Sequence, residues 1–227
     1  MHRLFSRFLI ALTTAVMLSA APAYADDDLA FRLRTSAPEL NRHVLQLALD
    51  ALDCARADGM PAVARLAVID YSRPSTEPRL WVFDLKEAKL LFHERVAHGL
   101  NSGDNFTTAF SNQPESRESS LGLFRTSDTY QGSNGYSLRM DGLEPGFNDN
   151  ARERAIVMNG AAYVDDNIIG KLGRLGRSWG CPAVRMGVAR PMIDALKGGQ
   201  LLFAYYPDRQ WLTSSRFLHC QARTASR

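Results

Sequence analysis

From Arg65 onward the chain is a succession of short β-rich runs divided by turn-forming residues, and this rhythm limits the folds open to it. Short runs of apolar, β-branched and aromatic residues between Gly, Pro, Asn and Ser clusters are typical of strands. Lys86-Glu87-Ala88 is expected to join two of these strands as a hairpin. The pattern predicts a mainly β (α+β) fold. The expected strands cover residues 66–71, 79–85, 89–99, 121–127, 136–140, 154–158 and 201–206.

Two segments have helical rather than strand periodicity. Ser36-Ala37-Pro38-Glu39 has the form of a capping box, and apolar residues follow it at three- and four-residue steps as far as Gly59-Met60-Pro61. We therefore expect an amphipathic helix in an N-terminal appendage, residues 26–63. A shorter helix over 191–197, in the C-terminal half, is expected to end at Gly198-Gly199.

The first 25 residues have the pattern of a secretory signal peptide. Arg3 and Arg7 make a positive start, residues 8–20 are an apolar run, and Ala23-Tyr24-Ala25 fits a cleavage site. We expect cleavage before Asp26; an uncleaved membrane anchor is the alternative. No later stretch reaches the roughly 20 apolar residues of a membrane span. The mature protein is therefore expected to be exported, with no stable membrane anchor.

Charge and cysteine content narrow the function further. Removing residues 1–25 takes away two arginines and no acid, which lowers the formal net charge from +3 to +1. A nearly neutral chain gives no support to a nucleic-acid-binding role. The chain has three cysteines, and an oxidising compartment allows one pair with one left over. Because Cys181 has the setting of a reactive thiol, Cys54 and Cys220 are the expected pair, and two free thiols are the alternative.

Cys181 stands between a glycine and a proline, among arginines. Gly180 allows close backbone approach, and Pro182 pushes Cys181 toward an extended conformation, so that the thiol projects from a rigid turn. Arg177 and Arg185 are expected to favour the thiolate, which is the nucleophilic form. The alternative is a structural cysteine packed in a turn. A cysteine nucleophile also needs a base, normally a histidine brought close by the fold.

Several blocks of sequence share their order with a known family. The blocks are Leu80-Trp81-Val82-Phe83-Asp84, Val96-Ala97-His98-Gly99, Ser119-Ser120-Leu121-Gly122, Gly135-Tyr136-Ser137-Leu138-Arg139, Ile156-Val157-Met158-Asn159-Gly160 and Gly176-Arg177-Ser178-Trp179-Gly180-Cys181-Pro182-Ala183. Together, over residues 64–206, they resemble the L,D-transpeptidase (YkuD-like) family of murein enzymes. The resemblance implies a β-sandwich or barrel with the cysteine at the end of a strand. It also implies a peptidoglycan stem peptide as substrate.

The family's chemistry, carried over by resemblance, makes Cys181 the nucleophile. It attacks the carbonyl that joins the diamino acid at stem position three to the D-alanine at position four. D-Alanine leaves, and an amine of a neighbouring stem takes the acyl group. Backbone N–H groups near Gly180 and Cys181 are expected to hold the oxyanion, because Pro182 has no N–H to donate. No metal or organic cofactor is expected.

The resemblance also suggests residues that contact the substrate. Arg177 or Arg185 would pair with stem carboxylates through a planar guanidinium, or would belong to a solvated basic face. Trp179 would wall the thiol site or fill the core. The remaining expected contacts are Gly160 and Ser178 of the matched motifs and His98.

One position departs from the family pattern. The family has a His-Gly pair where this chain has Asn159-Gly160, and that histidine is the base for the cysteine. An asparagine amide orients a thiol by hydrogen bonding but does not accept a proton near neutral pH. Of the remaining histidines, His98 is the best placed to contact the site, and a structural role is the more favoured reading of it.

We therefore predict a periplasmic or wall-associated L,D-transpeptidase-like protein with a catalytic domain at residues 64–207 and a C-terminal tail at 208–227. Its expected partners are peptidoglycan stem peptides. A catalytically silent peptidoglycan-binding scaffold and an L,D-carboxypeptidase, in which water replaces the acceptor amine, are the alternatives.

Overall fold

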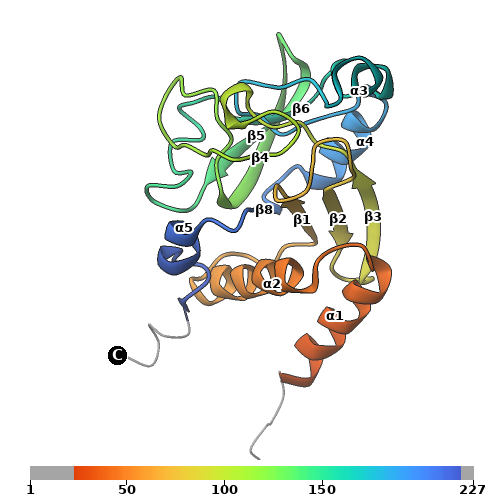
Figure 1. Ribbon diagram of the computed structural model, residues 1–227. Coiled ribbons are helices and arrows are strands. Elements are labelled where there is room, and N and C mark those ends of the chain that lie inside the picture. Colours follow the sequence, from red (N-terminus) through yellow and green to blue (C-terminus); the bar gives the residue numbers. More distant parts are fainter. Residues whose placement is uncertain (1–22, 221–227) are drawn as a thin grey trace, which may run out of the picture.

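The computed structural model describes residues 23–220 (Figure 1). The signal peptide expected at residues 1–25 therefore lies almost wholly outside the described residues. The helices are α1 Ala23–Ser36, α2 Arg42–Ala57, the short 3-10 helix η1 Leu100–Ser102, α3 Asp166–Leu172, α4 Met186–Leu196 and α5 Arg209–Ser214. The strands are β1 Arg65–Asp70, β2 Leu80–Asp84, β3 Lys89–Glu94, β4 Gly122–Gly132, β5 Gly135–Gly142, β6 Val157–Gly160, β7 Ala183–Val184 and β8 Leu201–Tyr205.

The strands form one eight-stranded sheet in the order β3-β2-β1-β8-β4-β5-β6-β7. Two neighbouring pairs, β1 with β8 and β6 with β7, are parallel, and the other pairs are antiparallel. The sheet curls into a nearly closed, barrel-like form. This confirms the β-rich α+β fold that the alternation of β-rich runs and turns predicts.

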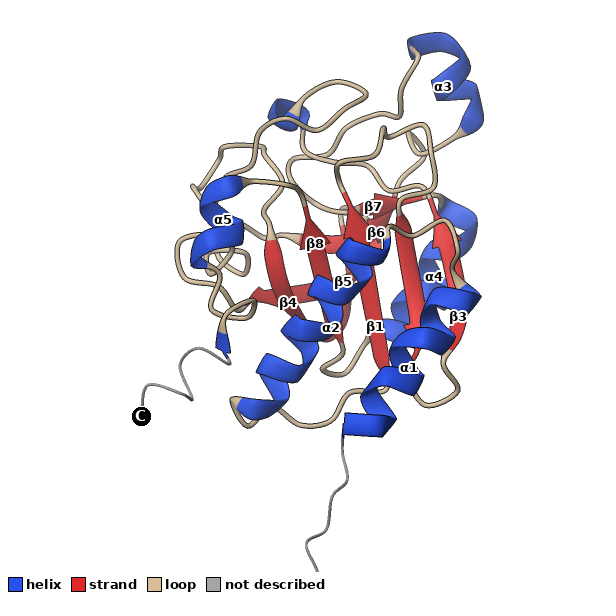
Figure 2. Cartoon of the chain, turned by 60° about the horizontal axis from the view of Figure 1, so that its bottom comes forward, coloured by secondary structure: helices blue, strands red, loops and turns tan. Residues whose placement is uncertain are grey.

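The central strands are buried because helices cover the sheet on both faces. Figure 2 shows α1 and α2 on one face and α4 on the other. β1 is buried from its second residue to its last, and β8 is buried throughout. Strands covered on both faces read as continuous apolar runs rather than as alternating patterns. The runs Leu66–Asp70 and Leu201–Tyr205 have that form.

The helix expected to start at Ser36 is α2, and it begins later than the sequence suggests. Ser36 is the last residue of α1, where its hydroxyl donates to the Leu33 carbonyl, and it caps nothing that follows. The next helix, α2, is capped instead by Asn41, whose side chain accepts from the His43 N–H at 2.8 Å. The capping box is therefore wrong, because Asn41 is an equally good cap that lies closer to Val44, the first buried residue of the helix.

Other segments also differ from expectation. α4 begins at Met186 rather than at Pro191, because its buried stripe already starts at Val188. β3 stops at Glu94, short of the expected end of that strand. α1, α3 and α5 are helices that the sequence analysis did not predict.

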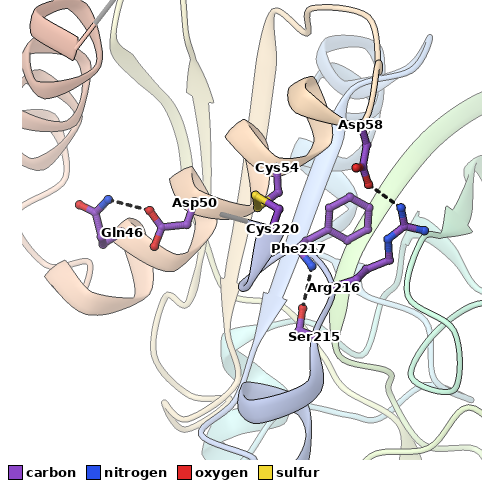
Figure 3. The surroundings of a disulfide bond; sticks show 8 residues. All are labelled: Gln46, Asp50, Cys54, Asp58, Ser215, Arg216, Phe217 and Cys220. Atoms are coloured by element: carbon purple, nitrogen blue, oxygen red, sulfur yellow. Dashed lines mark hydrogen bonds and ion pairs between the residues drawn. A yellow bond between two sulfur atoms is a disulfide. The ribbon is translucent and has the colours of Figure 1, made fainter. Parts of the chain in front are cut away.

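Within the described residues, the segment 208–220 of the expected C-terminal tail is tied to the core. Trp211 of α5 is fully buried, and its indole N–H donates to Glu144 at 3.0 Å. A disulfide joins Cys220 to Cys54 of α2, with 5.6 Å between the Cα atoms (Figure 3). Buried Cys54 belongs to the same apolar cluster as the strands, so α2 is part of the main core rather than an appendage to it. Within residues 23–220, no helix is long and apolar enough to cross a membrane.

Candidate active site

The free cysteine lies beside the starting ends of two parallel strands. Asn159 of β6 pairs with Ala183 of β7, and Cys181 comes two residues before that strand. The segment after β3 lies against the same turn, with Ala97 bridged to Ala183 and Gly99 bridged to Ser178. The register of the sheet therefore brings Asn159 and Cys181, which lie 22 positions apart in sequence, to one edge.

Ser178 holds the turn that carries the thiol. Its hydroxyl donates to the Cys181 carbonyl at 2.7 Å and accepts the Gly180 N–H at 3.1 Å. Gly180 has φ +117°, and a Cβ there would lie 2.7 Å from the Glu118 carbonyl oxygen. Only glycine fits this conformation without strain. Ser178 thus shapes the turn, and it also lines the thiol cavity, where we expected it to contact substrate.

The thiol makes two backbone contacts. Its sulfur accepts the Val157 N–H at 3.5 Å and donates to the Ala155 carbonyl at 3.7 Å. Ala155 has φ +53°, an uncommon conformation for a residue with a side chain. The turn that ends at Ala155 therefore aims its carbonyl at the sulfur, where the sequence predicted an ordinary strand.

A cavity of about 440 Å³ opens above the sulfur. Asn159 forms part of its wall and is almost fully buried, whereas Trp179 at its rim is 71% exposed. Trp179 is therefore a wall of the site and not a core residue. The lining residues are Ser133, Asn134, Arg154, Ala155, Asn159, Tyr163, Arg177, Ser178, Trp179 and Cys181.

The cation that acts on the thiol is Arg154, which the sequence analysis missed. Its guanidinium donates to the carbonyl and hydroxyl oxygens of the loop 111–118 and of Ser120, at 2.5–3.0 Å. Burial lowers its pKa, while the nearby Cys181 raises it. Arg154 thus fastens this loop to the thiol pocket and lends the pocket a positive charge. No sequence motif marked it.

The thiol is nevertheless not activated in this state. Burial raises the pKa of Cys181, and the Val157 N–H and the Arg154 charge lower it by less. Arg177 and Arg185, which we expected to favour the thiolate, are not the cations responsible. The resting form is therefore the neutral thiol.

Alkylation of Cys181 by iodoacetamide should accordingly keep rising as the pH is raised through and beyond about 8.5, the usual pKa of a cysteine. The sign follows from the raised pKa, because the thiolate fraction grows only as the pH approaches it. Intact mass at fixed times over pH 6–10 would measure the rate. A plateau below neutral pH would contradict this assignment.

Arg177 and Arg185, which we expected to contact the substrate, lie in different places in the structure. Arg177 lines the thiol cavity, donates to the Gly103 carbonyl at 2.9 Å and pairs with Asp104. Arg185 lies outside the cavity and forms a two-point ion pair with Glu94, at 2.7 and 2.8 Å. The Arg185 guanidinium is therefore already paired with a carboxylate of the protein itself.

His98 does not reach the thiol cavity. The imidazole is 1% exposed; Nδ1 lies 2.7 Å from Arg79 Nη2, and Nε2 lies 3.3 Å from the Gly103 carbonyl. Burial and the Arg79 charge lower its pKa to about 4. His98 stays neutral, and only its backbone carbonyl contacts the turn that carries the thiol, by accepting the Ser178 N–H at 2.9 Å. The structural role that the sequence favoured for it fits this geometry, whereas a substrate contact does not.

Asn159 lines the cavity, and Gly160 follows it in β6 without lining it. The Asn159 side-chain amide donates to the Gly160 carbonyl at 2.9 Å. Gly160 itself lies under α4, where an added Cβ would come within 2.8 Å of Ala189. It supports the wall rather than the substrate.

Tyr163 is a second site residue that the sequence did not reveal. It lines the cavity, and burial, with the nearby Cys181, raises its pKa to about 12. Its phenol therefore stays protonated and is available as a donor at any physiological pH. Its contact with Gly176 is so close that a Cβ there would lie 2.3 Å from the Tyr163 Cβ and 2.7 Å from the nearest ring atom. Gly176 was the one feature of the sequence that could have pointed to Tyr163.

A cysteine beside the start of two parallel strands, at the floor of a cavity walled by a tryptophan and an asparagine, defines a thiol site in a barrel-like fold. A sequence model of the L,D-transpeptidase catalytic domain matches residues 36–205. The chain belongs to this family. The match includes α2, in keeping with its place in the core. A search of curated proteins found no match.

Solved structures with distant similarity include an L,D-transpeptidase from Mycobacterium smegmatis, at 12% identity and a TM-score of 0.40 over 64% of this chain and 60% of that one. L,D-transpeptidase 1 of Mycobacterium tuberculosis has 15% identity and a TM-score of 0.34, with 63% and 62% covered. An L,D-transpeptidase from Stackebrandtia nassauensis has 13% identity and a TM-score of 0.36, with 83% and 94% covered. The chain thus spans about 60% of the length of the first two.

Proposed function

We propose that the protein carries out cysteine acyl transfer on peptidoglycan stem peptides, with Cys181 as the nucleophile. The observation that carries the proposal is the Cys181 sulfur at the floor of an open cavity beside Arg154, in a chain that belongs to the L,D-transpeptidase catalytic domain family.

The first half-reaction forms a thioester. Cys181 sulfur adds to the carbonyl of the diamino acid at stem position three, the bond to D-alanine breaks, and the thiol proton leaves with the D-alanine amine. The Gly180 N–H is already engaged by Ser178, so the N–H of Cys181 is the donor we assign to the oxyanion. The sequence analysis expected the N–H groups of both Gly180 and Cys181 to hold the oxyanion, and this assignment keeps only that of Cys181.

Arg177 is the residue we assign to a carboxylate of the donor stem. It borders the thiol cavity, and its buried Nε has no hydrogen-bond partner within residues 23–220. Its ion-pair partner, Asp104, is 81% exposed, and exposed pairs contribute little, so a substrate carboxylate could replace it.

A second candidate function is a silent peptidoglycan-binding scaffold. The observation that favours it is the absence of any histidine among the residues that line the thiol cavity, together with the raised pKa of Cys181. General-base help is worth roughly 10²–10⁴-fold, so its loss could leave binding without useful turnover.

Mass spectrometry of disaccharide-tetrapeptide incubated with the protein tests these assignments. A cross-linked dimer would support transpeptidation, a trimmed tripeptide would indicate the carboxypeptidase, and unchanged substrate would indicate the scaffold. Intact mass after exposure to a carbapenem should show one adduct, absent from the Cys181→Ala variant. An adduct that persists in the variant would overturn the role of Cys181.

The location we propose is the cell envelope, outside the cytoplasm. The signal-peptide pattern of residues 1–25 supports it, as does the disulfide, which persists in oxidising compartments. The intact mass of the exported protein should correspond to a chain that begins at Asp26. Retention of residues 1–25 in the membrane fraction would contradict this.

A further inference from the structure

Arg79 is a fully buried arginine that the proposed chemistry does not use. Within residues 23–220 its guanidinium forms no ion pair, and its donors meet neutral acceptors instead. The acceptors are the carbonyls of Arg73 and Val96 at 2.8–3.1 Å, the Thr107 hydroxyl at 3.2 Å and Nδ1 of His98 at 2.7 Å. Because a buried charge needs all its hydrogen bonds, these acceptors hold Arg79 in one orientation, and Arg79 in turn holds the imidazole.

The bond from Arg79 determines which nitrogen of His98 carries the proton. A guanidinium only donates hydrogen bonds, so Nδ1 of the imidazole must accept. Burial and the charges of Arg79 and Arg177 lower the pKa of His98 to about 4, so the ring is neutral and its single N–H is at Nε2. Nε2 lies 3.3 Å from the Gly103 carbonyl oxygen and therefore donates to it.

The same carbonyl holds Arg177 at the wall of the thiol cavity. Nη1 of Arg177 donates to the Gly103 carbonyl at 2.9 Å and to Asp104 at 3.0 Å, and the Arg177 side chain has no other hydrogen-bond partner within residues 23–220. A carbonyl oxygen has two lone pairs, so it accepts from the imidazole and the guanidinium together. When a stem carboxylate replaces exposed Asp104, the Gly103 carbonyl is the contact that keeps the guanidinium in place.

We propose that His98 is a positioning residue that holds Arg177, through the Gly103 carbonyl, in the orientation that binds a carboxylate of the donor stem. This inference rests on the proposed acyl transfer. His98 touches neither the substrate nor the thiol, so its loss should weaken binding of the stem and leave the chemistry at Cys181 unchanged. Loss of its N–H would leave the Gly103 carbonyl held by Arg177 alone, which would then have to hold both this carbonyl and the substrate.

Two substitutions separate the two hydrogen bonds of His98. His98→Asn keeps an acceptor near the Nδ1 position for Arg79 and loses the donor to Gly103, whereas His98→Gln keeps an N–H that reaches Gly103. With disaccharide-tetrapeptide as substrate, His98→Asn should raise KM roughly tenfold at unchanged kcat, and His98→Gln should keep KM near the parent's. Arg177→Gln should raise KM at least as much. Adding His98→Asn to Arg177→Gln should change KM no further, because one residue acts through the other.

Amidated substrates identify the carboxylate that Arg177 binds. Amidation of either the side-chain carboxylate of the diamino acid or the carboxylate of the terminal D-alanine should raise the parent's KM roughly tenfold. With that amide as substrate, His98→Asn should equal the parent. The absence of an effect from both amides would overturn the proposal, as would a His98→Asn variant that lowers kcat at unchanged KM.

Leu45→Ala is the control for a general loss of stability, because Leu45 is buried in α2. It should lower the midpoint of urea unfolding and leave KM unchanged. A rise in KM for Leu45→Ala equal to that for His98→Asn would show that the effect reports stability alone, and would overturn the positioning role.

Binding to the Cys181→Ala protein separates this inference from the proposed catalysis. Calorimetric titration with the disaccharide-tetrapeptide should give a Kd roughly tenfold weaker when His98→Asn is added, and a parental Kd when His98→Gln is added. This pattern without any acylation of the parent would retain the positioning role and refute the proposed catalysis. Equal Kd values for the two variants in an active enzyme would overturn the positioning role and leave the catalysis standing.

Discussion

Asn159→His should raise the rate at which a carbapenem or a tetrapeptide acylates Cys181 by about 10²-fold or more. Asn159 lines the cavity above the sulfur, so an imidazole at this position would border the thiol. The asparagine amide donates to the Gly160 carbonyl and has no site that accepts a proton near neutral pH. A histidine would supply both the base and a cationic partner for the thiolate, against the raised pKa that burial imposes on Cys181.

Asn134→His is the matched control, because Asn134 lines the same cavity from the β4–β5 turn. Its imidazole would add a base to the rim without occupying the position of the family histidine, and it should change the rate little. Intact mass during the first minutes of the reaction measures both variants. Equal rates for the parent and for Asn159→His would show that Asn159 is not the position of the missing base.

The pH profile gives an independent check of the same assignment. The parent should acylate faster as the pH rises toward the raised pKa of Cys181, whereas Asn159→His should reach its plateau nearer neutral pH. His98→Gln should leave the shape of the parent's profile unchanged, because His98 is buried, neutral and held by Arg79. Loss of the alkaline rise in His98→Gln would make that histidine part of the acid–base chemistry.

Removal of the disulfide should have the largest effect on stability. The Cys54–Cys220 bond closes a loop with a sequence separation of 166, and removing a native disulfide typically costs about 2–5 kcal/mol of unfolding free energy. The variant Cys54→Ala/Cys220→Ala should therefore unfold at a clearly lower urea concentration. The same segment is also held by Phe217, which is buried, and by an ion pair between Arg216 and Asp58 (Figure 3). These contacts should keep the variant folded at room temperature.

Cys181→Ala is the control for the disulfide, since it removes a cysteine without opening the loop, and its midpoint in urea should stay close to the parent's. A count of thiols under denaturing, non-reducing conditions should find one in the parent. Three thiols there, or an unchanged midpoint in the double variant, would contradict the stabilising role of the bond.

Much of the fold could be predicted from local sequence patterns. β1 and β8 follow from their continuous apolar runs, and the β2–β3 hairpin follows from its polar connection. The errors lie where two local signals compete, as at Ser36 and Asn41, or where tertiary burial overrides a local preference. Pro191 in the interior of α4 is such a case, because the helix gains more by burying Val188 and Ala189 than proline costs it.

The sequence by itself determined the family and the cysteine on its glycine-supported turn, because these depend on the order and identity of neighbouring residues. It also predicted that Asn159 replaces a histidine base. Only the tertiary structure decided which charged groups meet the thiol. It brought Arg154 to Cys181, paired Arg185 with Glu94, and buried His98 against Arg79. The physical reason is that electrostatic interactions depend on distance and burial across the fold, which a linear spacing of residues does not encode.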